Sequence, residues 1–217
     1  AYAVNGVTGN LTAIAIKDMK SSEKIDLLDG NDIDVKSMVE ENCAGFVYGD
    51  MTSVAVSEDG SKLAVAIQAE NYADTGRVAL FTCNADGTLT FDKVYETGVQ
   101  PDMVTFASND SKILTADEGE PRDGYGDGII DPKGTVTIIN LADQTVSQVD
   151  FTSYDNSDSR EQLVESGVIL KKNTNPSVDF EPEYIAVGDK TAYVTLQEAN
   201  AIAVSYTHLR AHETGAY

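Results

Sequence analysis

Apolar and polar residues alternate in short runs along most of this chain, which is the pattern of β-strands. The clearest example is Pro101–Pro121, PDMVTFASNDSKILTADEGEP, where two alternating runs flank the polar turn Ser108–Ser111. The second run leads directly into Asp117–Glu120, which carries three carboxylates. Because like charges repel at this spacing, the sequence predicts that a cation or water meets the end of this strand.

The same unit recurs twice. Met51–Glu70, MTSVAVSEDGSKLAVAIQAE, aligns with Pro101–Pro121 without a gap, and Glu181–Asn200, EPEYIAVGDKTAYVTLQEAN, aligns with a shorter turn. An additional apolar run follows each copy. A repeat of about 40 to 50 residues with several strands is typical of β-propeller blades, and chance similarity between strands is the alternative. We therefore expect an all-β chain, a partial β-propeller of three to four blades.

Two insertions interrupt the strand pattern. Arg122–Gly134, RDGYGDGIIDPKG, spaces Asp123, Asp127 and Asp131 four residues apart among glycines. Oxygen ligands on a flexible loop suit calcium, although the bidentate Glu of an EF-hand is missing and a solvated turn is the alternative.

The longer insertion, Ala142–Asp179, predicts one short helix. Asp158 followed by Glu161 is typical of a helix start, and Gly167 stands where a helix would end. The expected helix is Ser159–Ser166, and Lys171–Asp179 is expected to be a loop.

At the other end of the chain, Ala1–Ile16 predicts a β-hairpin and Val35–Glu41 fits either a short helix or a loop. The chain starts at Ala1 inside a strand, so we expect it to be a fragment of a longer protein. Cys43 and Cys83 are expected to be small buried apolar residues, with one disulfide as the alternative.

The chain is strongly acidic. Its 36 acidic and 15 basic residues give a formal net charge of −21. Nucleic acids and anionic membranes need a positive partner and are excluded, whereas divalent cations fit; solubility alone is the alternative explanation. The chain contains no run of 18 apolar residues, so the sequence predicts no membrane-spanning helix.

The last segment departs from the repeat. Val204–Thr214, VSYTHLRAHET, matches over its whole length one reading frame of a transposase-type sequencing adapter. We expect residues 1–203 to be the propeller domain and residues 204–217 to be a tail of adapter origin. For that reason the pair His208 and His212 is not interpreted as a metal site.

Four segments carry a family resemblance: GDMTSVAVSEDGSKLAVAIQAE, QPDMVTFASNDSKILTADEGEP, DPKGTVTIINL and FEPEYIAV…KTAYVTLQEANAIAV. They resemble the choice-of-anchor I family, in order from Ala1 to about Ala203. That family comprises secreted or cell-surface propellers with YVTN-like repeats, similar to mesenchyme-specific cell-surface glycoproteins, and some relatives carry an alkaline-phosphatase label. The resemblance implies an extracytoplasmic propeller, seven-bladed when complete and associated with calcium.

In a propeller, equivalent positions of successive blades converge. Gln68, Glu118 and Gln197 are equivalent, as are Glu70 and Glu120. A ring of oxygen ligands would suit Ca²⁺, or Mg²⁺ with more water; hydrogen bonding to backbone or exposure to solvent is the alternative. The expected metal ligands are Glu118, Glu120, Glu181, Glu183, Glu70, Asp123, Asp127 and Asp131, and the other expected ligand contacts are Gln197, Glu198 and Arg122.

Two classes of function remain. The first is a calcium-associated binding or scaffold domain whose partner is a cell-surface or extracellular-matrix component. The second is a metal-dependent phosphoesterase that acts on a phosphate ester. Arg122 and Arg77 are near the expected site and could contact the phosphate, and surface salt bridges are the alternative for both. The chain has no nucleophile elbow, no phosphate-binding glycine loop and no histidine before residue 204, so the binding domain is preferred.

Overall fold

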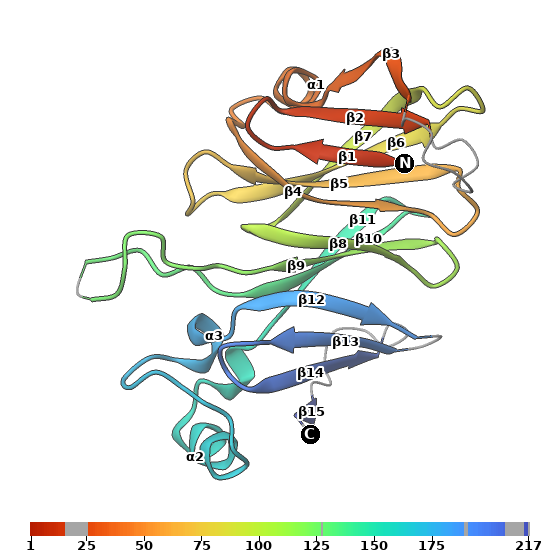
Figure 1. The fold of residues 1–217 in the computed structure, drawn as a ribbon. Coiled ribbons are helices and arrows are strands. Elements are labelled where there is room, and N and C mark those ends of the chain that lie inside the picture. Colours follow the sequence, from red (N-terminus) through yellow and green to blue (C-terminus); the bar gives the residue numbers. More distant parts are fainter. Residues whose placement is uncertain (16–25, 127, 189–190, 207–214, 217) are drawn as a thin grey trace.

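The computed structural model describes residues 1–15, 26–126, 128–188, 191–206 and 215–216, which form four antiparallel sheets (Figure 1). The first sheet contains β1 (Tyr2–Asn5), β2 (Asn10–Ala15) and β3 (Asp26–Asp34). The second contains β4 (Tyr48–Val56), β5 (Lys62–Ala69), β6 (Thr75–Cys83) and β7 (Leu89–Val99). The third contains β8 (Pro101–Ala107), β9 (Lys112–Asp117), β10 (Thr135–Asn140) and β11 (Thr145–Asp150). The fourth contains β12 (Pro182–Val187), β13 (Thr191–Leu196), β14 (Ala201–Tyr206) and β15 (Gly215–Ala216). The expected all-β architecture is confirmed.

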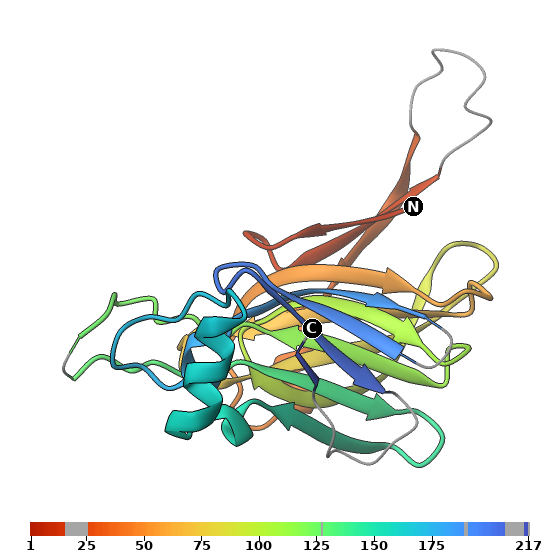
Figure 2. The same ribbon diagram turned by 90° about the horizontal axis from the view of Figure 1, so that it is seen from below.

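Each sheet is a meander of strands that are consecutive in the sequence. The sheets follow one another in chain order, and their first strands are neighbours: β1 contacts β4, β4 contacts β8, and β8 contacts β12 (Figure 1). When the molecule is turned by 90°, the helical insertion lies at one end of the strands and hairpin turns lie at the other end (Figure 2). Equivalent strand ends of successive sheets therefore come close together.

The repeat predicted from the sequence holds at the level of strand register. Val54 pairs with Val65 in the second sheet, and the residues 50 positions later, Val104 and Thr115, pair in the third. The first strand of each of the last three sheets also contains a β-bulge. The bulges lie between Met51 and Ser53, between Pro101 and Met103, and between Pro182 and Ile185. The three copies are thus structural equivalents and not chance similarities between strands.

The core lies between the sheets. In the second sheet, one face presents four apolar side chains to the third sheet: Ala64, Ala66, Val78 and Leu80. The equivalent residues of the third sheet face the fourth: Leu114, Ala116, Val136 and Ile138. In the fourth sheet the equivalent positions are Tyr193, Thr195, Ile202 and Val204. Tyr193 is 48% exposed and Ile202 is 49% exposed, so this last face is uncovered in the chain as described.

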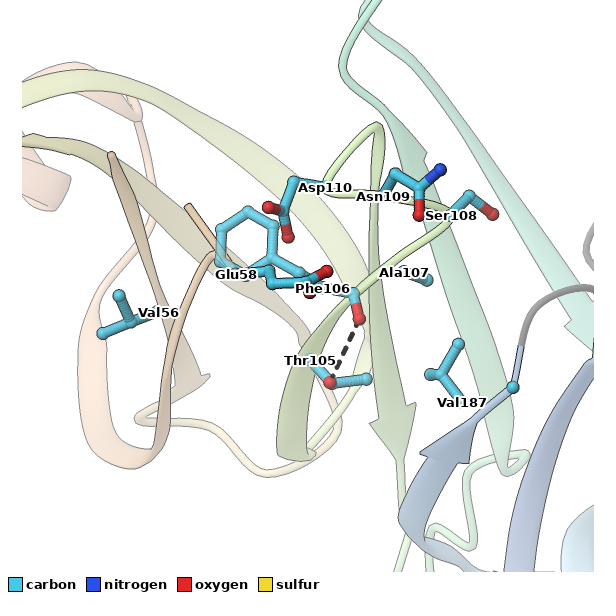
Figure 3. Close-up of a pocket in the computed structure, with 10 residues that line it drawn as sticks. Val56, Glu58, Thr105, Phe106, Ala107, Ser108, Asn109, Asp110 and Val187 are labelled. Carbon is cyan, nitrogen blue, oxygen red and sulfur yellow. Dashed lines mark hydrogen bonds between the residues drawn. The ribbon is translucent and has the colours of Figure 1, made fainter. Parts of the chain in front are cut away.

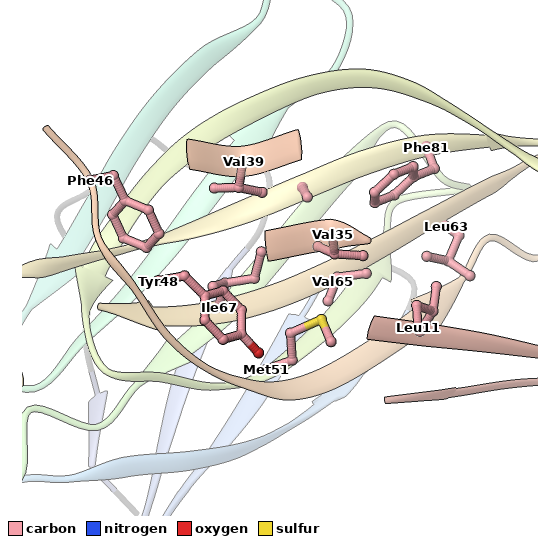
Figure 4. Packing of buried hydrophobic residues seen from close by; sticks show 11 residues of the cluster. Leu11, Val35, Val39, Phe46, Tyr48, Met51, Leu63, Val65, Ile67 and Phe81 are labelled. Atoms are coloured by element: carbon pink, nitrogen blue, oxygen red, sulfur yellow. The ribbon is translucent and has the colours of Figure 1, made fainter. Parts of the chain in front are cut away.

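The first and second sheets enclose the helix α1 (Val35–Asn42). Its buried residues Val35 and Val39 pack with Leu11 of β2 and with Phe81 of β6 (Figure 4). The Asp34 side chain caps the helix by accepting a hydrogen bond from Ser37 N at 2.9 Å. Of the two alternatives for this segment, the helix is confirmed.

The insertion after β11 contains more helix than expected. The predicted helix is present as α2 (Ser157–Glu165), which begins after the cap Asn156 and ends before Gly167, whose φ is +98°. The 3₁₀-helix η1 (Thr152–Tyr154) precedes it. The predicted loop Lys171–Asp179 is wrong in its last four residues, which form α3 (Pro176–Asp179). Proline at the start of a helix favours this turn, and the Asp155 carboxylate accepts hydrogen bonds from Ser177 N and Oγ at 2.9 and 2.8 Å.

Strand β14 continues to Tyr206, three residues beyond the strand expected from the sequence, and pairs with β13 along its whole length. His208 and His212 lie outside the described residues, and the adapter origin of the tail stays a prediction. Cys43 and Cys83 are free, half-buried thiols that pack against the core of the first two sheets.

A buried carboxylate joins the strands of the third sheet to the end of β7. Asp117 is fully buried and accepts hydrogen bonds from the hydroxyls of Thr115, Thr135 and Thr137 at 2.7, 2.9 and 2.6 Å, and from Gly98 N at 3.2 Å. A Cβ at Gly98 would lie 2.1 Å from Thr135 Oγ1. Only glycine therefore allows β7 to approach this carboxylate.

Replacing this carboxylate should be costly. Asp117→Ala leaves three buried hydroxyls without their acceptor, and Gly98 N keeps only its hydrogen bond to Thr137 Oγ1 at 3.0 Å. We therefore expect a loss of about 2–4 kcal/mol in the free energy of unfolding, measured with urea. The matched control is Asp143→Ala, which removes similar hydrogen bonds to Thr145 in an exposed turn and should cost less than about 1 kcal/mol. Equal losses in the two variants would contradict this role of Asp117.

Candidate functional site

Six carboxylates from two sheets gather between the third and fourth sheets, at the end of the strands where the insertions lie. Three belong to the third sheet and three to the fourth: Asp102, Glu118 and Glu120, then Glu181, Glu183 and Glu198, here called the acidic cluster. Glu118 interacts electrostatically with Asp102, Glu120 and Glu183. Glu183 in turn interacts with Glu198, Asp102 and Glu181. The two halves therefore form one electrostatic unit.

The bulges of the first strands place two of these side chains. Asp102 is the bulged residue of β8, and Glu183 lies in the bulge of β12. A β-bulge turns a side chain away from the regular alternation, which here directs both acids to the same end of adjacent sheets. In the second sheet the equivalent residue is Thr52, whose hydroxyl donates to Pro101 O at 2.7 Å. At this position the second sheet therefore contributes a hydrogen bond to the third sheet, whereas the third and fourth sheets contribute acids to the cluster.

Two basic side chains enter the acidic cluster. Arg122 lies 3.5 Å from Glu118 and 3.2 Å from Glu120, measured between nitrogen and carboxylate oxygen. Lys171 Nζ lies 2.9 Å from Glu181 Oε1 and 3.3 Å from Asp179 Oδ1. Two cations facing six carboxylates leave the cluster with net negative charge.

Gln100 holds the cluster to the sheet. Its buried side chain donates from Nε2 to Tyr72 O at 3.0 Å and to Glu120 O at 2.6 Å, and its Oε1 accepts from Arg122 Nε at 3.0 Å. Its backbone has a φ of +55°, which is uncommon for a residue other than glycine. The bonds to Glu120 and Arg122, together with the backbone hydrogen bond from Glu118 N to Gln100 O at 2.9 Å, fix the segment after β9.

The pKa of two glutamates is raised to about 7. Burial is the main cause at Glu118, followed by the negative charges of Asp102 and Glu120, while Arg122 acts in the opposite direction. Burial is also the main cause at Glu183, followed by the charge of Glu198. At both glutamates the ionised form is thus disfavoured first by burial and then by neighbouring negative charge.

The structure brings together most of the site residues predicted from the sequence. Glu118, Glu120, Glu181, Glu183, Glu198 and Arg122 belong to one site. Asp131 lies near it and interacts with Lys171, and Asp123 forms a hydrogen bond with the Tyr72 hydroxyl.

The remaining predicted residues lie elsewhere. Glu70 lines a different pocket, of about 390 Å³, with Phe46 and Arg77. Gln197 is exposed in the turn after β13, and Asp127 lies outside the described residues.

Sequence reasoning missed Gln100, Asp102 and Lys171. The repeat contained a signal for Asp102, because an acid follows the proline in both Pro101-Asp102 and Pro182-Glu183. Lys171 had no such signal, since it comes from an insertion outside the repeat.

As the side chains stand, no three His, Cys, Asp or Glu residues in the described part of the chain form a group that could hold a metal ion. Arg122 and Lys171 bond to the carboxylates that such an ion would need. What the arrangement offers is a negatively charged surface of oxygen ligands and two glutamates that exchange protons near neutral pH.

We expect Glu118 to titrate near pH 7 in a ¹³C NMR measurement of its side-chain carboxyl. Arg122→Gln should raise this pKa further, because it removes the positive charge that favours the ionised form. Since the folded-state pKa is raised, the stability contributed by Glu118 is present at acidic pH and is lost as the pH rises through about 7. Lys93→Gln on β7, where Lys93 bonds to Gln144, is the control and should leave the titration unchanged. A Glu118 pKa near 4 would contradict the site as described.

Comparison with solved structures supports the fold. A crystal structure of a protein from Lactobacillus plantarum matches with a TM-score of 0.55 and 13% identity, over 100% of this chain and 52% of that protein. A candidate 6-phosphogluconolactonase from Bacteroides uniformis matches with a TM-score of 0.48 and 14% identity, over 96% of this chain and 53% of that protein. The chain thus spans about half the length of these structures, and at such identity the first match shows a shared fold alone.

No functionally curated protein matches the sequence. Residues 1–211 match the sequence profile of the choice-of-anchor I domain, and the chain therefore belongs to the choice-of-anchor I domain family.

Proposed function

We propose that this chain is part of a secreted or cell-surface β-propeller, a binding and scaffold domain, and that its acidic cluster binds calcium. The observation that supports it most is the acidic cluster itself, in which equivalent positions of two successive sheets contribute acids to one site. Membership of the choice-of-anchor I domain family favours a location at the cell surface. No helix among the described residues is long and apolar enough to cross a membrane.

The propeller is supported by the repeated packing of the sheets. In the second and in the third sheet, one apolar face is covered by the sheet that follows it in the chain. The fourth sheet has an equivalent face, but Tyr193 and Ile202 on it are about half exposed. A further sheet packed in the same way would bury both side chains, and seven such sheets would close a ring.

Calcium is the cation that fits this ligand set. All six side chains offer carboxylate oxygens, and calcium accepts six to eight oxygen ligands in flexible geometry, whereas magnesium requires a near-octahedral arrangement. Asp131 Oδ1, near Lys171, is buried and has no hydrogen-bond partner among the described residues. Binding requires Arg122 to release Glu118 or Glu120, and an entering divalent cation would restore the ionised state of both raised glutamates.

Calcium should raise the unfolding temperature of the chain by several degrees at millimolar concentration, because a ligand that binds only the folded state stabilises it by about 2.7 kcal/mol at 100 times its Kd. The double variant Glu118→Gln with Glu183→Gln should lose this shift. Glu161→Gln, an exposed acid on α2, is the matched control and should keep it. An unfolding temperature that calcium leaves unchanged in the wild-type chain would refute the proposal.

The alternative function, a metal-dependent phosphoesterase, is tested with the same variants. Under the proposed function the chain does not hydrolyse p-nitrophenyl phosphate, with or without calcium. Hydrolysis that a chelator abolishes, and that is lost in Glu118→Gln and in Glu181→Gln, would replace the binding domain with the phosphoesterase.

A further inference from the structure

A second site lies at the opposite end of the strands. A pocket of about 340 Å³ opens where the first hairpins of the second and third sheets meet the end of β12 (Figure 3). Val56 at the end of β4, Phe106 in β8 and Val187 at the end of β12 contribute its apolar wall. Along β8, Asp102 and the pocket-lining Phe106 are separated by roughly 13 Å of extended strand, and none of the residues that line the pocket belongs to the acidic cluster. The pocket is therefore independent of the acidic cluster.

The charged residues of the pocket are both acids. Glu58 and Asp110 line it beside the Phe106 ring (Figure 3), and none of its ten lining residues, all within the described part of the chain, is basic. Asp110 Oδ2 accepts a hydrogen bond from Asp59 N at 3.3 Å, which fixes the carboxylate across two sheets. Ser108 Oγ, in the same wall, is buried without a hydrogen-bond partner among the described residues. The pocket thus combines two carboxylates, an uncommitted hydroxyl and an aromatic ring.

We propose that this pocket binds an alkylammonium group. An ammonium head would lie between the Glu58 and Asp110 carboxylates, and its methylene stem would pack against Phe106, Val56 and Val187. The ring adds a cation–π attraction, and the charge of −21 on the chain raises the local concentration of any cation. Among the described residues that line the pocket, an anion would meet two like charges and no basic side chain. The same chemistry is offered by a free alkylamine and by a lysine side chain of a protein.

The test uses the full chain and saturation-transfer NMR with three probes of equal length. n-Butylammonium should bind with millimolar affinity, about five-fold tighter than n-butanol, and butyrate should not bind. The double variant Glu58→Gln with Asp110→Asn should remove this preference; Asn tolerates the φ of +60° at position 110 and keeps an oxygen for Asp59 N. Phe106→Leu keeps the apolar wall but removes the ring, and should weaken butylammonium and not butanol.

Equal binding of butylammonium and butanol, or a preference that survives in the double variant, would overturn the proposal. Glu118→Gln, at the other end of the strands, is the control and should leave amine binding unchanged. The calcium response should persist in the pocket variants, so failure of one site is distinguishable from failure of the other. A tighter Kd for Nα-acetyl-lysine methylamide than for butylammonium would assign the group to a protein partner, and an equal Kd to a free amine; both outcomes support the site.

Discussion

The packing of one sheet against the next is the constraint on which the rest of this structure depends. The second and third meanders have apolar side chains on both faces, so each buries them only when a neighbouring sheet lies on either side. The repeat length and the strand register serve this requirement, because they put side chains of similar size at equivalent positions, as Ala66 and Ala116 show. Both candidate sites follow from it, since sheets stacked in register bring equivalent strand ends together.

Acidic side chains gather at both ends of the strands, and their negative charge is balanced differently at each end. At the insertion end, six acids are crowded and all except the exposed Glu198 are buried or half-buried, while Arg122 and Lys171 offset part of their charge. At the hairpin end, Glu58 and Asp110 have no basic side chain beside them among the described residues that line their pocket. Concentrating negative charge at both ends keeps it out of the packed layers, where the fully buried Asp117 needs four hydrogen-bond donors.

The repeat was the part of the fold most readily predicted from the sequence. Val54 and Val104 occupy the same register position because the spacing of apolar residues and turn is identical in both copies. The helix α3 escaped prediction because a carboxylate from outside it, that of Asp155, fixes its first turn. For the acidic cluster, repeat equivalence identified Glu118 and Glu120 but not the ion pair with Lys171, which depends on how an insertion folds back over the sheet.

The bulge in the first strand of each repeat allows one side chain to vary without a change in the packing of the sheet. The bulged position is Thr52 in the second sheet, Asp102 in the third and Glu183 in the fourth, while the residues around it keep their pairing. A substitution at this position changes the side chain that a repeat presents at the strand end without changing the pairing of the residues around it. Substitutions at the bulged positions during evolution would accordingly change the number of acids in the acidic cluster one at a time, so selection could adjust the cluster independently of the fold.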